Sequence, residues 1–266
     1  MFFGMPARIF NRNGKPVHGT VGFIGALLKI IRMTRPTHVA VLFDGEHENA
    51  RVDLNADYKA NRPDYSKVSD EDNPFTQLPD IYAAIDNLKI KRAETTVCET
   101  DDWISAYALT YGKDTQIVIS SFDSDYFQLI TDEVSVLRYR GVKTEICTPD
   151  YVQSRYGVSP AQYADFKSLV GDSSDNIKGA DKIGPKTAAA LLNEFSTLEN
   201  IISNADRIVR PSVRESIIKN TERLKTNYKL IKLTDGAILP FKLDDLIYSA
   251  PASTTTEVLK DTGVLP

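Results

Sequence analysis

The sequence predicts an α/β protein, a three-layer domain with a parallel sheet, followed by a helical subdomain. Over residues 1–148, short β-branched runs alternate with segments whose apolar residues recur at helical spacing. This alternation is typical of a parallel sheet covered by helices. From residue 149 the strand-like runs stop and helical segments follow one another. We therefore expect an α/β domain over 1–148 and a helical subdomain over 149–266, which ends in a loop-like tail after Leu239.

Each element is expected from its own local pattern. Apolar residues at helical spacing predict a helix over 21–31, and the compact run THVAVLFDG predicts a buried strand within 37–45. Residues 46–75 are polar with little apolar periodicity, so we expect a long mobile segment, which in a compact domain is usually functional. The other expected strands lie at 94–98, 116–121, 134–139 and 143–147, and the other expected helices at 76–90, 101–111, 124–131, 149–156, 160–170, 185–194, 197–203, 211–220 and 222–233.

Composition excludes several classes of protein. The chain has 266 residues, 42% hydrophobic and 26% charged, which is typical of a soluble globular protein with a full core. Two cysteines, Cys98 and Cys147, form neither a disulfide framework nor a zinc pattern, and they favour a reducing compartment. No apolar run is long enough to span a membrane and no signal peptide is recognisable. A cytoplasmic protein with no membrane partner is expected.

Acidic side chains recur where predicted strands end and helices begin. In ISSFDSDYFQLI, residues 119–130, two aspartates follow a β-branched run, and one such pair alone is best explained as a helix cap. Capping does not explain three acids within four residues in ETDDW, or the repetition of the pattern. Three of the four acidic groups follow predicted parallel strands, whose carboxyl ends carry the sites of open α/β sheets. The eight acids are Asp44, Glu99, Asp101, Asp102, Asp123, Asp125, Asp172 and Asp175.

The chemistry of these acids favours divalent cations. Converging carboxylates repel one another and raise one another's pKa values unless cations neutralise them. An all-carboxylate set without histidine suits Mg²⁺ or Mn²⁺, and eight ligands suit two ions. Of the 36 acidic residues, these eight leave 28 against 32 basic ones, a balance of +4. The rest of the surface is therefore compatible with a polyanion such as nucleic acid.

Two basic stretches could hold that polyanion. In ADYKANRPDY a helix would place Lys59 and Arg62 on one face beside Tyr58, where they suit a phosphate and a stacked base; a solvated loop is the alternative. In IKGADKIGPKTAAALL, residues 177–192, Gly184 predicts a tight turn before a helix whose first amides could bind phosphate, although Gly-Pro helix starts are common. The expected DNA-binding residues are Tyr58, Lys178, Lys182, Gly184, Lys186 and Thr187.

Taken together, five motifs resemble those of a known family. FDG, YKANR, ETDD, FDSDYFQLI and GDSSDNIKGADKIGPKTA occur, over residues 6–233, in the order seen in the 5′→3′ exonuclease domain of bacterial DNA polymerase I and in the stand-alone flap endonucleases. The resemblance implies a PIN-like sheet, a helical arch at about 46–75 and a helix–three-turn–helix at about 160–235 that holds duplex DNA and binds K⁺.

The same resemblance implies roles for the acidic and basic residues. Lys59 and Arg62 match the catalytic basic residues of the arch, which approach the scissile phosphate. The first metal site is implied for Asp44, Glu99, Asp101 and Asp102, and the second for Asp123, Asp125, Asp172 and Asp175.

In one respect the chain departs from the family. Relatives begin with an inner strand that ends in Asp-Gly and supplies a metal ligand, whereas this chain opens at FFGMPARIFNRNGKP, which resembles the segment directly after that strand. We expect the native protein to carry roughly 15–25 further N-terminal residues, enough for one strand and its turn.

The predicted function is that of a metal-dependent, structure-specific 5′ nuclease acting on 5′ flaps or 5′ ends of DNA in replication and repair. It is expected to act as a monomer, with a DNA polymerase as a candidate partner. The lost aspartate leaves open a catalytically impaired pseudo-nuclease that binds DNA junctions. A PIN-type ribonuclease shares the acidic sheet ends but lacks the helical subdomain, and a DxD phosphatase would carry a Thr that FDSDYF lacks.

Overall fold

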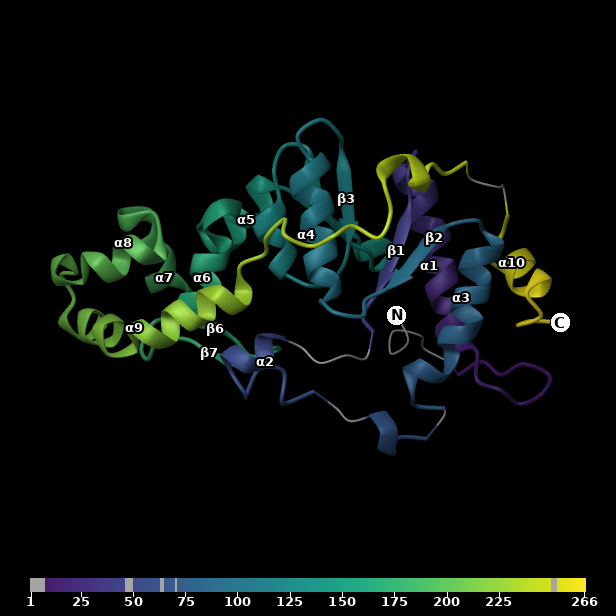
Figure 1. Ribbon diagram of the computed structural model, residues 1–266, viewed down its shortest axis with the longest axis horizontal. Coiled ribbons are helices and arrows are strands. Elements are labelled where there is room, and N and C mark those ends of the chain that lie inside the picture. Colours follow the sequence, from purple (N-terminus) through teal and green to yellow (C-terminus); the bar gives the residue numbers. More distant parts are fainter. Residues whose placement is uncertain (1–7, 46–49, 63–64, 70, 250–252) are drawn as a thin grey trace. The chain divides into compact units, whose positions relative to one another are not determined.

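The computed structural model describes residues 8–45, 50–62, 65–69, 71–249 and 253–266. These residues belong to two compact units, each assembled from separated stretches of sequence. The first unit takes 1–46, 63–96 and 239–266, and the second takes 47–62 and 97–238 (Figure 1). The predicted boundary between 148 and 149 is therefore not the boundary between the compact units.

The first unit joins a short parallel sheet to three helices. Strand β1 (Ala40–Phe43) pairs with β2 (Lys91–Glu94), which lies a few residues before the predicted 94–98. The apolar faces of α1 (His18–Thr34) and α3 (Leu78–Asn87) share one hydrophobic cluster with α10 (Thr255–Asp261). The expectation of a loop-like tail is wrong for this helix, because Val258 and Leu259 are buried and the Thr254 hydroxyl accepts from the Glu257 N–H.

In the second unit a three-stranded sheet is followed by helices. Strands β3 (Ile117–Ser120) and β4 (Val134–Arg138) pair in parallel, whereas β5 (Glu145–Cys147) pairs with β4 in the antiparallel sense. The short connection from β4 to β5 forces this reversal, since a parallel pair needs a crossover of a dozen or more residues. The α/β class is confirmed, but the described strands form separate sheets rather than one parallel sheet.

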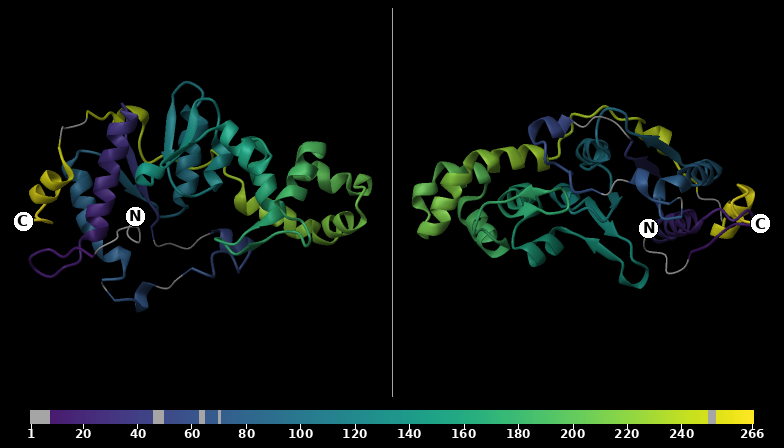
Figure 2. Two further views of the ribbon diagram at one scale, coloured as in Figure 1. Left: turned by 180° about the vertical axis from the view of Figure 1, so that it is seen from behind. Right: turned by 90° about the horizontal axis from the view of Figure 1, so that it is seen from below.

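A helical region completes the second unit, and Figure 2 shows its helices from two further sides. The two helices expected at 211–220 and 222–233 are one continuous helix, α9, because buried residues recur along its whole length. The helices are α5 (Pro149–Tyr156), α6 (Tyr163–Val170), α7 (Pro185–Phe195), α8 (Leu198–Ser203) and α9 (Pro211–Ile231), and the strands of a small hairpin between α6 and α7 are β6 (Gly171–Asp172) and β7 (Ile177–Lys178).

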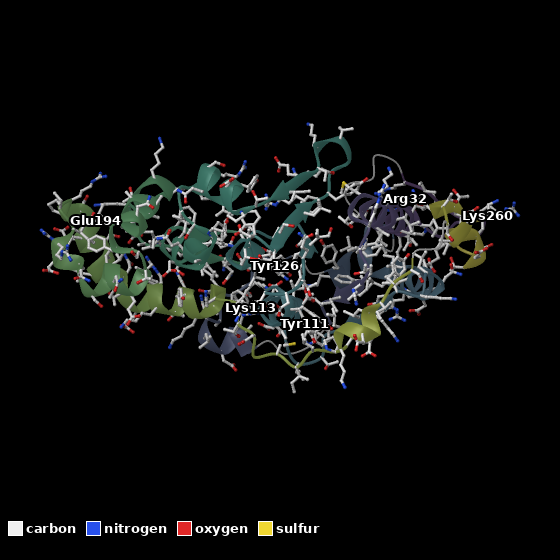
Figure 3. All side chains as sticks on the ribbon, turned by 90° about the horizontal axis from the view of Figure 1, so that it is seen from above. Arg32, Tyr111, Lys113, Tyr126, Glu194 and Lys260 are labelled. Atoms are coloured by element: carbon white, nitrogen blue, oxygen red, sulfur yellow. The ribbon has the colours of Figure 1, made fainter. Side chains whose placement is uncertain are left out.

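One hydrophobic core joins this helical region to the sheet. Phe127, Val136, Leu169, Leu192 and Leu224 are fully buried in a single cluster. Figure 3 labels Tyr126 in the interior of the unit and Glu194 at the surface of the helical region. Because the core is shared, the acidic residues that follow β3 and those of the β6–β7 loop are held by one rigid framework.

None of the helices in the described part is long and apolar enough to cross a membrane.

Two further helices and several 3₁₀ turns complete the described chain. The elements not yet given are α4 (Thr100–Tyr111), α2 (Ala50–Leu54) and the 3₁₀ turns η2 (Tyr65–Lys67), η3 (Pro74–Gln77), η4 (Asp125–Leu129), η5 (Gly141–Lys143), η6 (Pro160–Gln162), η7 (Ala205–Arg207) and η8 (Leu243–Leu246).

Candidate metal centre

Three acidic residues stand at the start of α4. The Asp102 carboxylate accepts the backbone N–H of Glu99, the residue before the helix, at 3.0 Å, so Asp102 also closes the helix end. Arg51 of α2 bonds to Glu99 and also reaches Asp102 at 2.7 Å. Glu99 further accepts from the Lys59 amine at 2.5 Å and from the Tyr58 hydroxyl at 3.2 Å. Glu99 and Asp102 are thus paired with basic residues of the 50–62 segment.

Asp101 points away from those contacts. Its carboxylate accepts the hydroxyl of Tyr126, which lies in the turn after β3. Burial raises the pKa of Asp101 to about 6, and the neighbouring Asp123 charge acts in the same direction, against the Tyr126 hydrogen bond. The Lys59 ammonium lowers the pKa of Asp101 but does not offset the burial, so near neutral pH Asp101 is close to its titration range.

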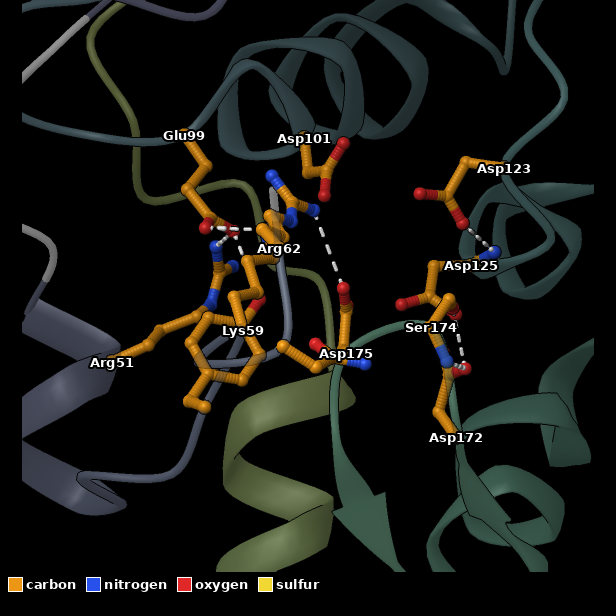
Figure 4. Close-up of polar contacts among 12 residues, drawn as sticks. Arg51, Lys59, Arg62, Glu99, Asp101, Asp123, Asp125, Asp172, Ser174 and Asp175 are labelled. Atoms are coloured by element: carbon orange, nitrogen blue, oxygen red, sulfur yellow. Dashed lines mark hydrogen bonds and ion pairs between the residues drawn. The ribbon is translucent and has the colours of Figure 1, made fainter. Parts of the chain in front are cut away.

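The second acidic group combines the end of β3 with the β6–β7 loop. The Asp123 carboxylate accepts the N–H of Asp125, the first residue of η4, at 2.9 Å, whereas Ser124 at the N-cap position makes no side-chain capping hydrogen bond. One oxygen from each of Asp125, Asp172 and Asp175 lies within 4.8 Å of the others. Figure 4 shows Asp123, Asp125 and Asp172 turned toward the same space, with Asp175 beside them. Residues about 50 positions apart in the sequence thus form a candidate cation site.

Two glycines let the β6–β7 hairpin hold its aspartates there. Gly171 has φ +85°, and a β-carbon on it would lie 2.5 Å from the Gly179 nitrogen. A β-carbon on Gly179 would lie 2.3 Å from the carbonyl carbon of Val170. Only glycine permits both this conformation and this approach, so the hairpin fixes the loop from Asp172 to Asp175.

A buried lysine belongs to the second group. Lys167 of α6 bonds through its amine to Asp125 and to Asp172, and its side chain is 7% exposed. Burial alone would raise the pKa of Asp172, but the Lys167 ammonium and the Ser174 hydrogen bonds lower it below its usual range. Burial raises the pKa of Asp125 to about 7, in spite of the same ammonium. Burial also raises the pKa of Asp175.

The 55–62 segment differs from the expected helix. Lys59 has φ +56° and the segment is a series of turns. It does not form a helix because its backbone hydrogen-bonds to the β6–β7 loop. The backbone N–H of Lys59 donates to the Asp175 carbonyl at 3.0 Å, and the Arg62 guanidinium lies 3.3 Å from the Asp175 carboxylate. The two cations expected to meet a phosphate therefore reach the carboxylates, a pairing that the sequence does not indicate.

Tyr58 does not offer a ring face to a base in this arrangement. It is 6% exposed and packs with Ala164, Ile177 and Leu230. The stacking role expected for Tyr58 is thus not supported, because the apolar body of the ring is used in the core.

The remaining expected residues are one acid of the first unit and the residues before and at the start of α7. Asp44 follows β1 and is exposed in the first unit, whereas the other seven acids belong to the second. Lys178, Lys182 and Lys186 are exposed around the N-terminus of α7, as expected. The tight turn there depends on Lys182, with φ +64°, and not on Gly184, whose backbone is extended. Thr187 lies in the first turn of α7 and is half-buried.

Lys167 and Arg51 were missed by the sequence analysis. Lys167 stands in YADFKSLV, five residues before Asp172, a short helix of mixed polar and apolar residues in which no local pattern distinguishes it. Arg51 lies in the polar 46–75 stretch, where nothing local distinguishes it.

The donors at this centre fit a hard divalent cation. All of the side-chain donors are carboxylate oxygens, and the buried Asp101 and Asp125 carry raised pKa values that a cation would lower. These features define the class of the protein. It is an α/β protein with a carboxylate-rich candidate metal centre and an attached helical region.

Comparison with known proteins identifies the family within that class. Residues 1–157 match the sequence profile of the 5′-3′ exonuclease N-terminal resolvase-like domain, and residues 158–254 match that of the 5′-3′ exonuclease C-terminal SAM fold. The chain belongs to the 5′-3′ exonuclease family.

Curated relatives support this assignment. The chain is 36% identical over 244 residues to the thermostable DNA polymerase I of Thermus thermophilus, a match that covers 91% of this chain and 28% of the relative. It is 32% identical over 252 residues to the 5′-3′ exonuclease of Buchnera aphidicola subsp. Schizaphis graminum, covering 93% of this chain and 83% of the relative. The chain thus spans little more than a quarter of the polymerase.

Solved structures share the fold. Zinc-bound T5 5′-exonuclease superposes with a TM-score of 0.69 at 20% identity, covering 80% of each chain. The catalytic core of Rad2 in complex with a DNA substrate superposes with a TM-score of 0.60 at 14% identity, covering 94% of this chain and 81% of Rad2.

Proposed function

We propose that this chain is a metal-dependent, structure-specific 5′ nuclease that hydrolyses DNA phosphodiester bonds at 5′ flaps or 5′ ends, in replication and repair. The observation that carries the proposal is the approach of Asp125, Asp172 and Asp175 to within 4.8 Å of one another, beside the buried Lys167 and the exposed Arg62. Membership of the 5′-3′ exonuclease family supports the same activity.

Two groups of carboxylates are proposed as metal ligands. Asp123, Asp125, Asp172 and Asp175 would hold one divalent ion, and Glu99, Asp101 and Asp102 the other, with Mg²⁺ or Mn²⁺ as the ion. When bound, such ions supply a hydroxide nucleophile near neutral pH and stabilise the charge of the phosphoryl transition state. The Tyr126 hydroxyl holds Asp101 in one orientation, which preorganises that ligand.

Lys59 and Arg62 are proposed to contact the reacting phosphate. In the structure they pair with Glu99 and Asp175, and the Arg62 side chain is 54% exposed. Both cations therefore stand beside the proposed metal ligands, where charge-assisted hydrogen bonds to phosphate oxygens would be favourable. Their loss should therefore slow cleavage more than it weakens DNA binding.

The loop before α7 is proposed to grip the duplex. Lys178, Lys182 and Lys186 are exposed beside the first amides of an 11-residue helix, and both features attract phosphate. A K⁺ ion bridging this loop to a phosphate, action as a monomer and a DNA polymerase partner are further parts of the proposal. The similarity to DNA polymerase I supports the last of these.

The test is cleavage of a labelled 5′-flap duplex, with a matched 3′-flap duplex beside it, in Mn²⁺ or Mg²⁺. We expect cleavage of the 5′ flap only, and a loss of about 100-fold or more in Asp175→Asn with flap affinity largely kept. Asp150→Asn, which removes an exposed carboxylate of α5 in the same unit, serves as the matched control.

The outcomes separate the proposed function from its alternatives. Flap binding without cleavage in either metal would establish a DNA-junction-binding pseudo-nuclease. Cleavage of single-stranded RNA in preference to flaps would establish a ribonuclease.

A further inference from the structure

Lys167 is the most enclosed cation of the candidate metal centre. Its side chain is 7% exposed, against 14% for both Arg51 and Lys59 and 54% for Arg62. It extends from α6, an eight-residue helix in which every residue from Tyr163 to Leu169 is buried. A lysine in such a place is costly to bury unless its charge is paired, and here it bonds to two carboxylates.

The Lys167 amine engages two of the three carboxylates that form the candidate cation site. Asp125 Oδ1 and Asp172 Oδ2 are its acceptors, and Asp175 completes the site. Asp172 turns its other oxygen, Oδ1, toward Ser174, accepting its N–H at 2.9 Å and its hydroxyl at 2.5 Å. Asp172 Oδ1 is therefore occupied by Ser174, and a divalent ion bound at Oδ2 would share that oxygen with the Lys167 ammonium.

We propose that Lys167 is a resident positioning cation of this site, which holds Asp125 and Asp172 together and competes with the divalent ion for their oxygens. This inference rests on the proposed function, because it concerns the metal site of the proposed nuclease. Lys167 keeps the carboxylates gathered when no ion is bound, and it weakens the affinity of this site relative to the other.

The helix that carries Lys167 cannot easily move aside. Asp165 accepts the N–H of Leu198 in α8 at 2.7 Å, and Asn227 of α9 donates to the Ser168 carbonyl at 3.0 Å, so α6 is tied to neighbouring helices on both sides of the lysine. The amine can yield its acceptors only through its own side-chain torsions. Its positive charge consequently stays close to an ion bound at Asp125, Asp172 and Asp175, and repels it.

The experiment measures Mn²⁺ binding without DNA, by calorimetry and by paramagnetic resonance, on the whole chain. Lys167→Met removes the charge and keeps an unbranched apolar side chain, and Lys167→Arg keeps the charge. Lys113→Met removes an exposed lysine of the same unit and is the matched control. We expect Lys167→Met to bind the weaker of two ions about tenfold tighter or more, with the arginine and control variants close to the parent protein.

Thermal melting supplies a second readout that a purely structural role would not give. Without metal, Lys167→Met should melt below the parent, because gathered carboxylates have lost their cation. The rise in melting temperature on adding Mn²⁺ should then be larger for Lys167→Met than for the parent. A folded Lys167→Met that binds Mn²⁺ no tighter than the parent overturns the inference.

If Lys167→Met does not fold, the parent protein itself provides the test. The Lys167 ammonium resonance, assigned by its absence from Lys167→Arg in ¹⁵Nζ-labelled protein, should shift as Mg²⁺ fills the weaker site. A resonance that stays unchanged at saturating Mg²⁺ refutes the competition. Absence of Mn²⁺ binding by the parent contradicts the proposed function instead, so the two failures are distinguishable.

Discussion

Replacing Asp172 by asparagine tests whether the acidic cluster is held together by its internal cation. Asp172 pairs with the buried Lys167 amine, and its side chain is 11% exposed. Removing one partner of a buried ion pair costs about 3–5 kcal/mol, because the other charge is left uncompensated. Asp172→Asn should therefore destabilise the metal-free protein, although it also removes a charge from a crowded group of acids.

Two features of the structure reduce the cost. Asparagine keeps the oxygen that accepts from Ser174, and Lys167 keeps Asp125 as an acceptor. Burial raises the pKa of Asp125, so that carboxyl compensates the Lys167 charge only in part. We expect a loss of about 2–4 kcal/mol in the free energy of unfolding at pH 7.

The pH dependence of this loss has a definite sign. The folded pKa of Asp172 is lowered, so its contribution is present above the unfolded value and is lost as pH falls through the folded value. The difference between parent and Asp172→Asn should therefore be largest near pH 7 and shrink below about pH 4.

Urea unfolding in EDTA, followed by near-UV circular dichroism, measures the effect. Asp181→Asn is the matched control, because Asp181 is 44% exposed and its two basic neighbours lie 3.9 Å away. Such an exposed pair contributes less than about 1 kcal/mol. An Asp172→Asn protein as stable as the parent at pH 7 would show that repulsion among the acids outweighs the pairing with Lys167.

The same structure supports three further predictions. Burial raises the folded pKa of Asp101 to about 6 and of Asp125 to about 7, so their contribution to stability without metal is lost as pH rises through these values. Over the same range the affinity for Mn²⁺ should grow, and binding should release protons. Calorimetry in two buffers of different ionisation enthalpy measures that release. Changing Lys182 and Lys186 together to alanine should reduce the salt dependence of duplex binding by about two phosphate contacts, and an unchanged slope counts against the grip. Lys59→Ala should slow single-turnover cleavage about tenfold or more with duplex affinity kept, and an equal loss of affinity would make Lys59 a binding residue only.

Local patterns were sufficient for much of the fold. The β-branched runs predicted β3 and β4 to within a residue or two, since β-branched residues favour strands even where, as in β3, only one residue is fully buried. Two features differ from the prediction. The short connection after β4 makes β5 antiparallel instead of parallel, and the segment predicted as two helices is the single helix α9. The predicted strand ends also indicated where acidic residues lie, directly after β3 and at the start of α4.

The centre could not be completed from local signals. Lys59 adopts a left-handed conformation because its N–H bonds to the Asp175 carbonyl, a contact across more than 100 residues. Arg51 and Lys167 become counter-ions only when α2 and α6 are brought to the carboxylates. Such pairings depend on tertiary packing, which neither helical spacing nor residue type encodes.

The most direct test of the proposed metal centre is the single-turnover rate of 5′-flap cleavage as a function of Mn²⁺ concentration. If two ions act together, cleavage should be absent in EDTA and should rise with about the square of the Mn²⁺ concentration before it saturates. Cleavage that persists in EDTA, or a fully bound flap that stays intact at saturating Mn²⁺, would contradict the claim that these carboxylates form the catalytic metal centre.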